Sequence, residues 1–139
     1  MSATTTTATD VIREFLPASP FVGHVGIELV ELGDGTATLT LPFRELVVTI
    51  GQIVHGGAIA ALIDTAAMAA AWAGAEMPDR PRGTTVGMSV SYLAPADGTD
   101  VTAAARVVRR GRRLVTVHVD VHTMDDVHVA TALVTYQLG

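Results

Sequence analysis

The chain has 139 residues and a formal net charge of −5, and 49% of its residues are hydrophobic although only 4% are aromatic. This length fits one domain with one core, and the negative charge argues against a general nucleic-acid binder. The absence of Cys excludes disulfides, thiolate metal sites and a cysteine nucleophile. A chain of this length with so many hydrophobic residues cannot easily bury all of its apolar surface as a monomer. The composition therefore predicts an oligomer.

The first forty residues predict a tail, a short helix and a hairpin. The Thr/Ala run over residues 1–9 lacks the basic and apolar regions of a signal peptide, so we expect a disordered tail there. Asp10 is expected to cap a helix over residues 11–16, which a following Pro stops. Residues 24–32 and 36–41 alternate loosely on either side of a Gly-Asp-Gly turn, which predicts a β-hairpin.

One long helix is predicted over residues 57–73. Ala, Leu, Ile and Met dominate this segment, and Gly74 stops it. The segment is apolar nearly all round, as expected of a helix that is buried on most sides. It is too short and too weakly apolar to span a bilayer, so we expect a soluble, cytoplasmic protein without a membrane partner.

Four strands are predicted after the helix. They cover residues 84–93, 101–109, 114–122 and 127–138, and the short turns between them indicate antiparallel meanders. The order is thus two strands, one buried helix and four strands. One helix cannot cover a six-stranded sheet unless the sheet curls round it. We therefore expect an α+β hotdog fold, an antiparallel six-stranded sheet wrapped around one central helix, as a single domain over residues 10–139.

Asp64 stands in the middle of the predicted apolar helix. Its neighbours three and four residues away are Ala60, Ala61, Ala67 and Met68. A carboxylate in such surroundings is costly unless it is hydrogen-bonded, paired or facing a cleft. The helix pattern leaves two interpretations open: a carboxylate at a functional site, and one that faces solvent or bonds a backbone group in a subunit interface.

The residues before this helix leave backbone amides free. His55, Gly56 and Gly57 lead into its first turn, where unpaired N–H groups and the positive end of the helix dipole face outward. Such a terminus can hold a carbonyl oxygen and stabilise the oxyanion that forms on attack. A plain loop-to-helix turn is the alternative. Asp64 lies about two turns, roughly 11 Å, further along the axis, so a second helix across a dimer interface would bring acid and amide together.

Three segments together carry a resemblance to a known family. The stretch VHGGAIAALIDTAAMAAA, the stretch TTVGMSVSYLAPA and a Gly-Arg turn between two strands resemble the hotdog acyl-CoA thioesterases of the phenylacetyl-CoA and 4-hydroxybenzoyl-CoA type. The resemblance covers about residues 23–138. It implies an enzyme that hydrolyses an acyl-CoA thioester to free acid and CoA, with no metal or other cofactor. It also implies a site built across a homodimer interface, with a dimer of dimers favoured.

The resemblance implies roles for four residues. In that family the residue matching Asp64 is the nucleophile or the general base that activates water. The residue matching Gly56 supplies the oxyanion N–H, and the one matching His55 supports the loop. A hydroxyl at the position of Thr85 helps to orient the attacking water.

The loop before the helix departs from the family at one position. Family members often carry Asn or Gln where this chain has Thr49. The side-chain amide of that Asn or Gln polarises the thioester or orients the acid. Gln52 is the candidate replacement if the loop is shifted, and it is otherwise a loop residue. Gly57, like Gly56, lacks a side chain that would block the approach of substrate.

Four Arg residues surround Gly111 in an otherwise acidic chain. Arg binds phosphate through two parallel hydrogen bonds, and in the resembling family this turn lies near the mouth where the CoA nucleotide sits. A solvated hairpin tip is the alternative interpretation. Arg80 and Arg82 are weaker candidates for the same role. The four residues of the turn are Arg109, Arg110, Arg112 and Arg113.

Two other functions are compatible with the same fold. A non-catalytic acyl-CoA binding protein would have little reason to keep Asp64. An acyl hydratase or dehydratase would use a catalytic His, in some members within a His-Phe-Pro motif that this sequence lacks. The remaining His residues show no metal-binding spacing and are expected to be surface or half-buried packing residues. They are His24, His118, His122 and His128.

Overall fold

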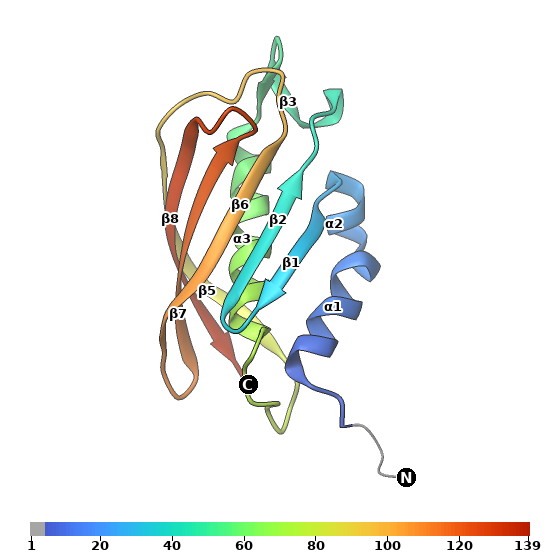
Figure 1. Cartoon of the computed structure of the whole chain (residues 1–139), viewed down its shortest axis with the longest axis vertical. Coiled ribbons are helices and arrows are strands. Elements are labelled where there is room, and N and C mark those ends of the chain that lie inside the picture. The colour runs from blue at the N-terminus through green and yellow to red at the C-terminus, as the bar shows by residue number, and fades with distance from the viewer. Residues whose placement is uncertain (1–4) are drawn as a thin grey trace.

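In the computed structural model, which describes residues 5–139, an antiparallel six-stranded sheet curves around one long helix (Figure 1). The strands lie in the order β1-β2-β6-β7-β8-β5. The predicted α+β hotdog fold is therefore confirmed. The long helix is α3 (Gly56–Trp72), and the strands are β1 (Glu28–Gly33), β2 (Thr36–Leu41), β5 (Gly83–Tyr92), β6 (Val101–Arg110), β7 (Leu114–Thr123) and β8 (His128–Leu138).

The smaller elements lie at the N-terminal side and ahead of α3. They are the helices α1 (Ala8–Ala18) and α2 (Pro20–Val25), the 3-10 helix η1 (Glu45–Val47), and a ribbon of β3 (Val48–Ile50) and β4 (Ile53–Val54). Figure 1 shows α1 and α2 beside β1, and the ribbon beyond the N-terminal end of α3. In the part of the chain that the structure describes, no helix is long and apolar enough to cross a membrane.

The concave side of the sheet buries α3 because the helix is apolar nearly all round. Leu62 and Ile63 are fully buried, and they belong to one core with sheet residues such as Val117. One face of α3 is not fully covered by the rest of residues 5–139. We call this the open face; it is formed by Gly57, Ala61, Asp64 and Met68, which are exposed or half-buried and recur every three or four residues.

Side chains from the sheet hold the C-terminal end of α3. Trp72 Nε1 donates a hydrogen bond to Tyr136 Oη (2.9 Å), and Arg110 Nη1 donates one to the carbonyl oxygen of Ala71 (2.8 Å). Burial raises the pKa of the Tyr136 phenol; the bond from Trp72 opposes this shift, and the charge of Asp64 adds to it. These contacts fix the helix at one level against the sheet.

The first helix differs from the prediction at both ends. α1 begins at Ala8 with Thr7 as its N-cap, whereas Asp10 occupies the third helical position and bonds back to the cap. The two residues exchange hydrogen bonds of 2.9 and 3.1 Å, which is a capping box. The helix therefore includes part of the segment predicted as a tail, and it ends at Ala18. Residues 1–4 of that segment lie outside the described residues.

The strand predicted over residues 24–32 is wrong in its first part. Pro20 occupies the first turn of α2, where its missing N–H costs nothing. Gly26 ends that helix in the left-handed conformation at φ 92°, and the strand β1 begins only at Glu28. The connection over residues 43–54, predicted to be mostly irregular, contains η1 and the β3–β4 ribbon.

The meander prediction holds for β6, β7 and β8 but not for β5. β5 pairs with β8, whereas β6 pairs with β2 and β7, so the Pro95–Gly98 turn leads across the end of the sheet and not into a hairpin. After α3 the chain forms β5 at the edge of the sheet beside β8. It must then cross the end of the sheet to form β6 beside β2. As a result, one edge of β5 has no partner strand among the described residues.

Candidate active site

Asp64 lies half-buried on the open face of α3, where β5 reaches its carboxylate. Thr85 Oγ1 donates a hydrogen bond of 2.6 Å to Asp64 Oδ1. Thr85 pairs with the buried Tyr136, so its side chain points to the concave side of the sheet. Within the described chain no protein group bonds Asp64 Oδ2. The acid and the hydroxyl predicted from the sequence are thus in contact, and one carboxylate oxygen is free.

The N-terminal end of α3 presents one unpaired amide. His55 is the N-cap, and its Nδ1 accepts a hydrogen bond from the N–H of Gly57 (2.7 Å). The His55 carbonyl accepts from the N–H groups of Ala58 and Ile59 (2.9 and 3.1 Å). The N–H of Gly56 has no acceptor among residues 5–139. The two bonds to the His55 carbonyl polarise the peptide group that carries this N–H and make it a stronger donor.

Tyr92, at the end of β5, closes over the same turn. Its Oη donates a hydrogen bond of 2.7 Å to the carbonyl oxygen of Gly56. A Cβ at Gly56 would stand 3.4 Å from the Tyr92 ring, so ring and glycine are in close contact. The sequence contained this residue within the motif of Tyr, Leu, Pro and Ala, but the motif alone assigned it no role.

Two cavities flank this end of α3. One, of about 370 Å³, is lined by Thr49, Gly56 and Tyr92 among mostly apolar neighbours. The other, of about 290 Å³, lies between α3, α2 and η1 and reaches Gly57. Gln52 lines neither cavity, because its exposed side chain lies against Gly98. The structure therefore brings Thr49 beside the free amide and leaves Gln52 apart from it.

Arg110, Arg112 and Arg113 of the β6–β7 turn line one cavity of about 540 Å³ together with Glu76 and Asp79, whereas Arg109 lies apart from them. Arg110 is engaged with the end of α3. Arg109 precedes it on the strand and pairs with Thr116, so its side chain points to the opposite, convex side of the sheet. Arg112 and Arg113 also line a second cavity, of about 470 Å³, together with Arg80, Arg82 and a single acidic residue, Asp79. The basic site that the structure forms thus joins half of the predicted cluster to the two weaker candidates.

Comparison with known proteins identifies the family. The family model described as Thioesterase superfamily matches residues 51–130, more than half of the chain. The chain belongs to the thioesterase superfamily. It is therefore a thioester hydrolase, as the sequence predicted, and the matched segment contains α3 and the whole of β5.

Individual relatives agree with this assignment. A protein of Halobacterium salinarum with the provisional name of an esterase is 32% identical over 122 residues, which cover 86% of this chain and 80% of that protein. The medium/long-chain acyl-CoA thioesterase YigI of Salmonella typhimurium is 29% identical over 138 residues, covering 90% and 89%. The PaaI protein of the Escherichia coli phenylacetic acid degradation operon shares the fold, with a TM-score of 0.82, 19% identity and coverage of 95% and 93%.

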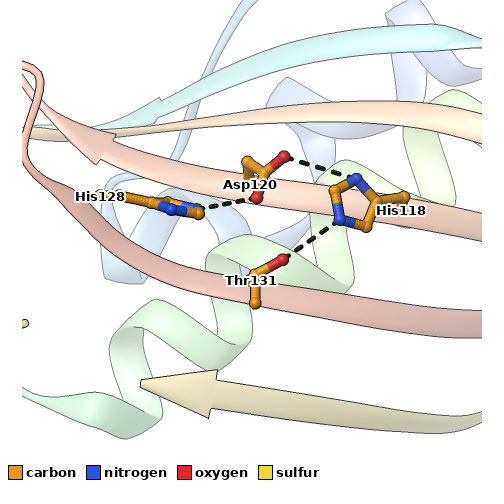
Figure 2. Close-up of polar contacts among 4 residues, drawn as sticks. All are labelled: His118, Asp120, His128 and Thr131. Carbon is orange, nitrogen blue, oxygen red and sulfur yellow. Dashed lines mark hydrogen bonds and ion pairs between the residues drawn. The ribbon is translucent and has the colours of Figure 1, made fainter. Parts of the chain in front are cut away.

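A second polar cluster lies on β7 and β8, on the convex side of the sheet (Figure 2). Asp120 Oδ1 accepts a hydrogen bond from His128 Nε2 (2.8 Å), and Asp120 Oδ2 lies 3.4 Å from His118 Nδ1. His118 Nε2 lies 3.1 Å from Thr131 Oγ1, and the His122 ring stacks on His128. Across the described residues no group of His, Asp or Glu is arranged to hold a metal ion. The three histidines of this cluster are half-buried or exposed, as expected, and His24 is exposed but lies in α2 and not in a strand.

This cluster makes stability depend on pH. Burial alone would raise the pKa of Asp120, but hydrogen bonds from Thr131 and His128 and the charges of His118 and His128 outweigh burial and lower it. A lowered folded-state pKa contributes stability above the ordinary carboxyl value, and this contribution is lost as the pH falls through the folded-state value.

We expect the free energy of unfolding of the wild type to fall as the pH drops from about 5 to about 3, and Asp120→Asn to show a shallower slope and lower stability at neutral pH. Urea denaturation at a series of pH values measures both slopes. Asp125→Asn, the same change in the exposed β7–β8 turn, serves as the control with the wild-type slope. Equal slopes for wild type and Asp120→Asn would contradict this assignment.

Proposed function

We propose that the chain hydrolyses acyl-CoA thioesters at a site that combines Asp64 of one protomer with the Gly56 amide of a second protomer. The observation that carries the proposal is the Thr85–Asp64 hydrogen bond on an otherwise apolar helix face. A carboxylate kept there at the cost of burial, with one oxygen fixed and the other free, has the arrangement of a general base. The unpaired Gly56 amide supplies the oxyanion donor that thioester hydrolysis requires.

The spacing along α3 argues for two protomers. Gly56 and Asp64 are eight residues apart on one rigid helix, which separates them by about 12 Å along its axis. The carbonyl carbon is attacked by the water that Asp64 activates, and the oxygen of the same carbonyl becomes the oxyanion that Gly56 holds. These two atoms are joined by one bond, so both protein groups must reach the same carbonyl. A single chain therefore does not bring both groups to one thioester.

The free edge of β5 provides the interface for a second copy. Val86 and Met88 on this strand are apolar and exposed, at 58% and 40%, and the strand's unpaired backbone groups are a template for another strand. Two copies related by a two-fold axis pair such edges antiparallel. With the axis near Met88, Tyr92 and Gly56 of one protomer meet Thr85 and Asp64 of the other. The open faces of the two α3 helices then cover each other.

Hydrolysis at this site follows ordinary acyl-transfer chemistry. The free Oδ2 of Asp64 takes a proton from a water molecule that Thr85 Oγ1 helps to orient, and the hydroxide forms a C–O bond to the thioester carbon. The Gly56 N–H holds the oxyanion of the tetrahedral intermediate. When the C–S bond breaks, CoA leaves as a thiolate, which needs no strong acid because thiols are acidic near pKa 8.5. The proton on Asp64 returns to solvent or to the thiolate.

The basic cavity supports CoA as the leaving group. Four Arg residues and one Asp give the cavity of about 470 Å³ a local positive charge in a chain of net charge −5. It lies near the C-terminal end of α3, and an antiparallel second protomer brings that end to the level of the first protomer's Gly56. Phosphate groups of CoA are bound there by Arg112 and Arg113 together with Arg80 and Arg82. The acyl-CoA activity named for the relative YigI is consistent with this substrate.

We expect Asp64→Asn to lower kcat for acyl-CoA hydrolysis by about a hundredfold or more, the scale of losing a general base, with the fold retained. Thiol release from a panel of short, long and aromatic acyl-CoAs measures this, and Glu31→Gln, which removes a carboxylate from β1, is the matched control. Turnover of Asp64→Asn within a few fold of wild type would refute the mechanism.

Single-turnover hydrolysis in ¹⁸O-labelled water separates the two forms of this chemistry. If Asp64 is a general base, the label enters only the acid product. If Asp64 attacks the carbonyl directly, the intermediate is a mixed anhydride: water that opens it at the Asp64 carbon leaves the label in the Asp64 carboxylate, and hydroxylamine traps the anhydride whichever carbon water attacks.

We expect the double change Arg112→Ala and Arg113→Ala, and separately Arg80→Ala with Arg82→Ala, to raise KM for acyl-CoA about tenfold or more, since each change removes charge-assisted hydrogen bonds to phosphate. The KM for the matching acyl-pantetheine thioester, which lacks the nucleotide, stays unchanged. Arg106→Ala, on the same strand pair but outside the cavity, is the charge control. Equal effects on both substrates would make the cavity residues structural.

A further inference from the structure

Tyr92 has contacts that the proposed mechanism does not yet use. It is 53% exposed, so its ring contributes little to the core. Its hydroxyl nevertheless donates to the Gly56 carbonyl at 2.7 Å, and its ring lies close enough to Gly56 that a Cβ there would be in contact at 3.4 Å. An exposed side chain that makes two specific contacts with the residue carrying the free amide calls for a functional explanation.

The two contacts act on the Gly56 N–H indirectly, through the backbone torsions of Gly56, because this N–H belongs to the His55–Gly56 peptide and the carbonyl that Tyr92 binds belongs to the next peptide. The Gly56 turn is held from one side by His55, whose Nδ1 binds the next amide, and His55 is anchored by its own N–H to the Val47 carbonyl (2.7 Å). Glycine lacks a side chain that would restrict its backbone, so the turn needs a second restraint. The Tyr92 hydroxyl supplies it from the opposite side by fixing the Gly56 carbonyl.

The placement of Tyr92 also affects the surroundings of the amide. Its ring forms one wall of the cavity of about 370 Å³ that contains Gly56 and Thr49. A ring at this place excludes water from one side of the N–H, and a donor in such surroundings stabilises an oxyanion more strongly than one in bulk water. Tyr92, at the end of β5, therefore positions the amide, and Thr85, near the start of the same strand, positions the acid.

From this geometry we infer that Tyr92 is a positioning residue for thioester hydrolysis: by holding the Gly56 carbonyl it fixes the Gly56–Gly57 peptide, and so restrains the backbone torsions of Gly56 on which the direction of the Gly56 N–H depends. The inference rests on the proposed function of Gly56. The Tyr92 hydroxyl donates a hydrogen bond to the Gly56 carbonyl and takes no part in proton transfer. Its effect is on the transition state, where the oxyanion exists, and not on binding of the ground-state thioester.

Tyr92→Phe tests this role because it removes the hydroxyl and keeps the ring. We expect kcat to fall about threefold to tenfold, the scale of one hydrogen bond to the backbone, while KM stays within about twofold of wild type. Tyr92→Leu, which also removes the ring, is expected to lower kcat further. The melting temperature of the Phe variant serves as the folding control. A kcat within twofold of wild type, or a higher KM with an unchanged kcat, would overturn the inference.

A second measurement does not depend on turnover. We expect amide hydrogen exchange, followed by NMR, to be about threefold or more faster at the hydrogen-bonded amides of His55, Gly57 and Ala58 in Tyr92→Phe than in wild type, with the core strand β7 unchanged. Unchanged exchange in this turn would also overturn the positioning role. If the wild type released no thiol from any acyl-CoA, the proposed function would fail by itself, and the exchange comparison would still decide whether Tyr92 fixes the turn.

Discussion

The fold depends on enclosing an apolar helix that carries one charged group. Because α3 is apolar on nearly every side, it is stable only where the concave sheet covers it. Asp64 is tolerated on this helix because it lies on the face that its own sheet leaves open and because a hydroxyl from β5 satisfies one of its oxygens. The same two conditions, an open face and a fixed carboxylate, are those that a general base needs.

Strand β5 links the acid, the amide and the proposed interface. Near its start Thr85 holds Asp64, its last residue, Tyr92, holds Gly56, and the edge between them is unpaired in the part of the chain that the structure describes. Acid and amide are fixed on one rigid helix about 12 Å apart, so their separation cannot adjust to a single substrate. Pairing of β5 with a second copy resolves this constraint and also covers the exposed apolar residues of the strand.

Local sequence signals predicted the elements and residues that do not depend on distant pairing. The apolar segment ending at Gly74 was sufficient for α3, and the cost of a charge within it singled out Asp64. The fold order and the hydroxyl of Thr85 followed from the pattern and the family resemblance. The position of β5 at the sheet edge was missed, because strand pairing is decided by the whole sheet and not by the Pro95–Gly98 turn. The role of Tyr92 was missed for the same reason, since its contact spans residues far apart in the sequence.

The measurement that tests the shared site most directly is activity in hybrid dimers. One variant is Asp64→Asn; the other is Gly56→Pro, which removes the N–H at the first helical position, where proline fits and where the extended His55 (φ −60°, ψ 132°) permits it. Each variant alone is expected to be inactive. Mixing equal amounts under conditions that exchange subunits should restore about a quarter of wild-type activity, because half of the dimers are hybrids with one complete site. No recovery despite verified subunit exchange would contradict a site shared between protomers.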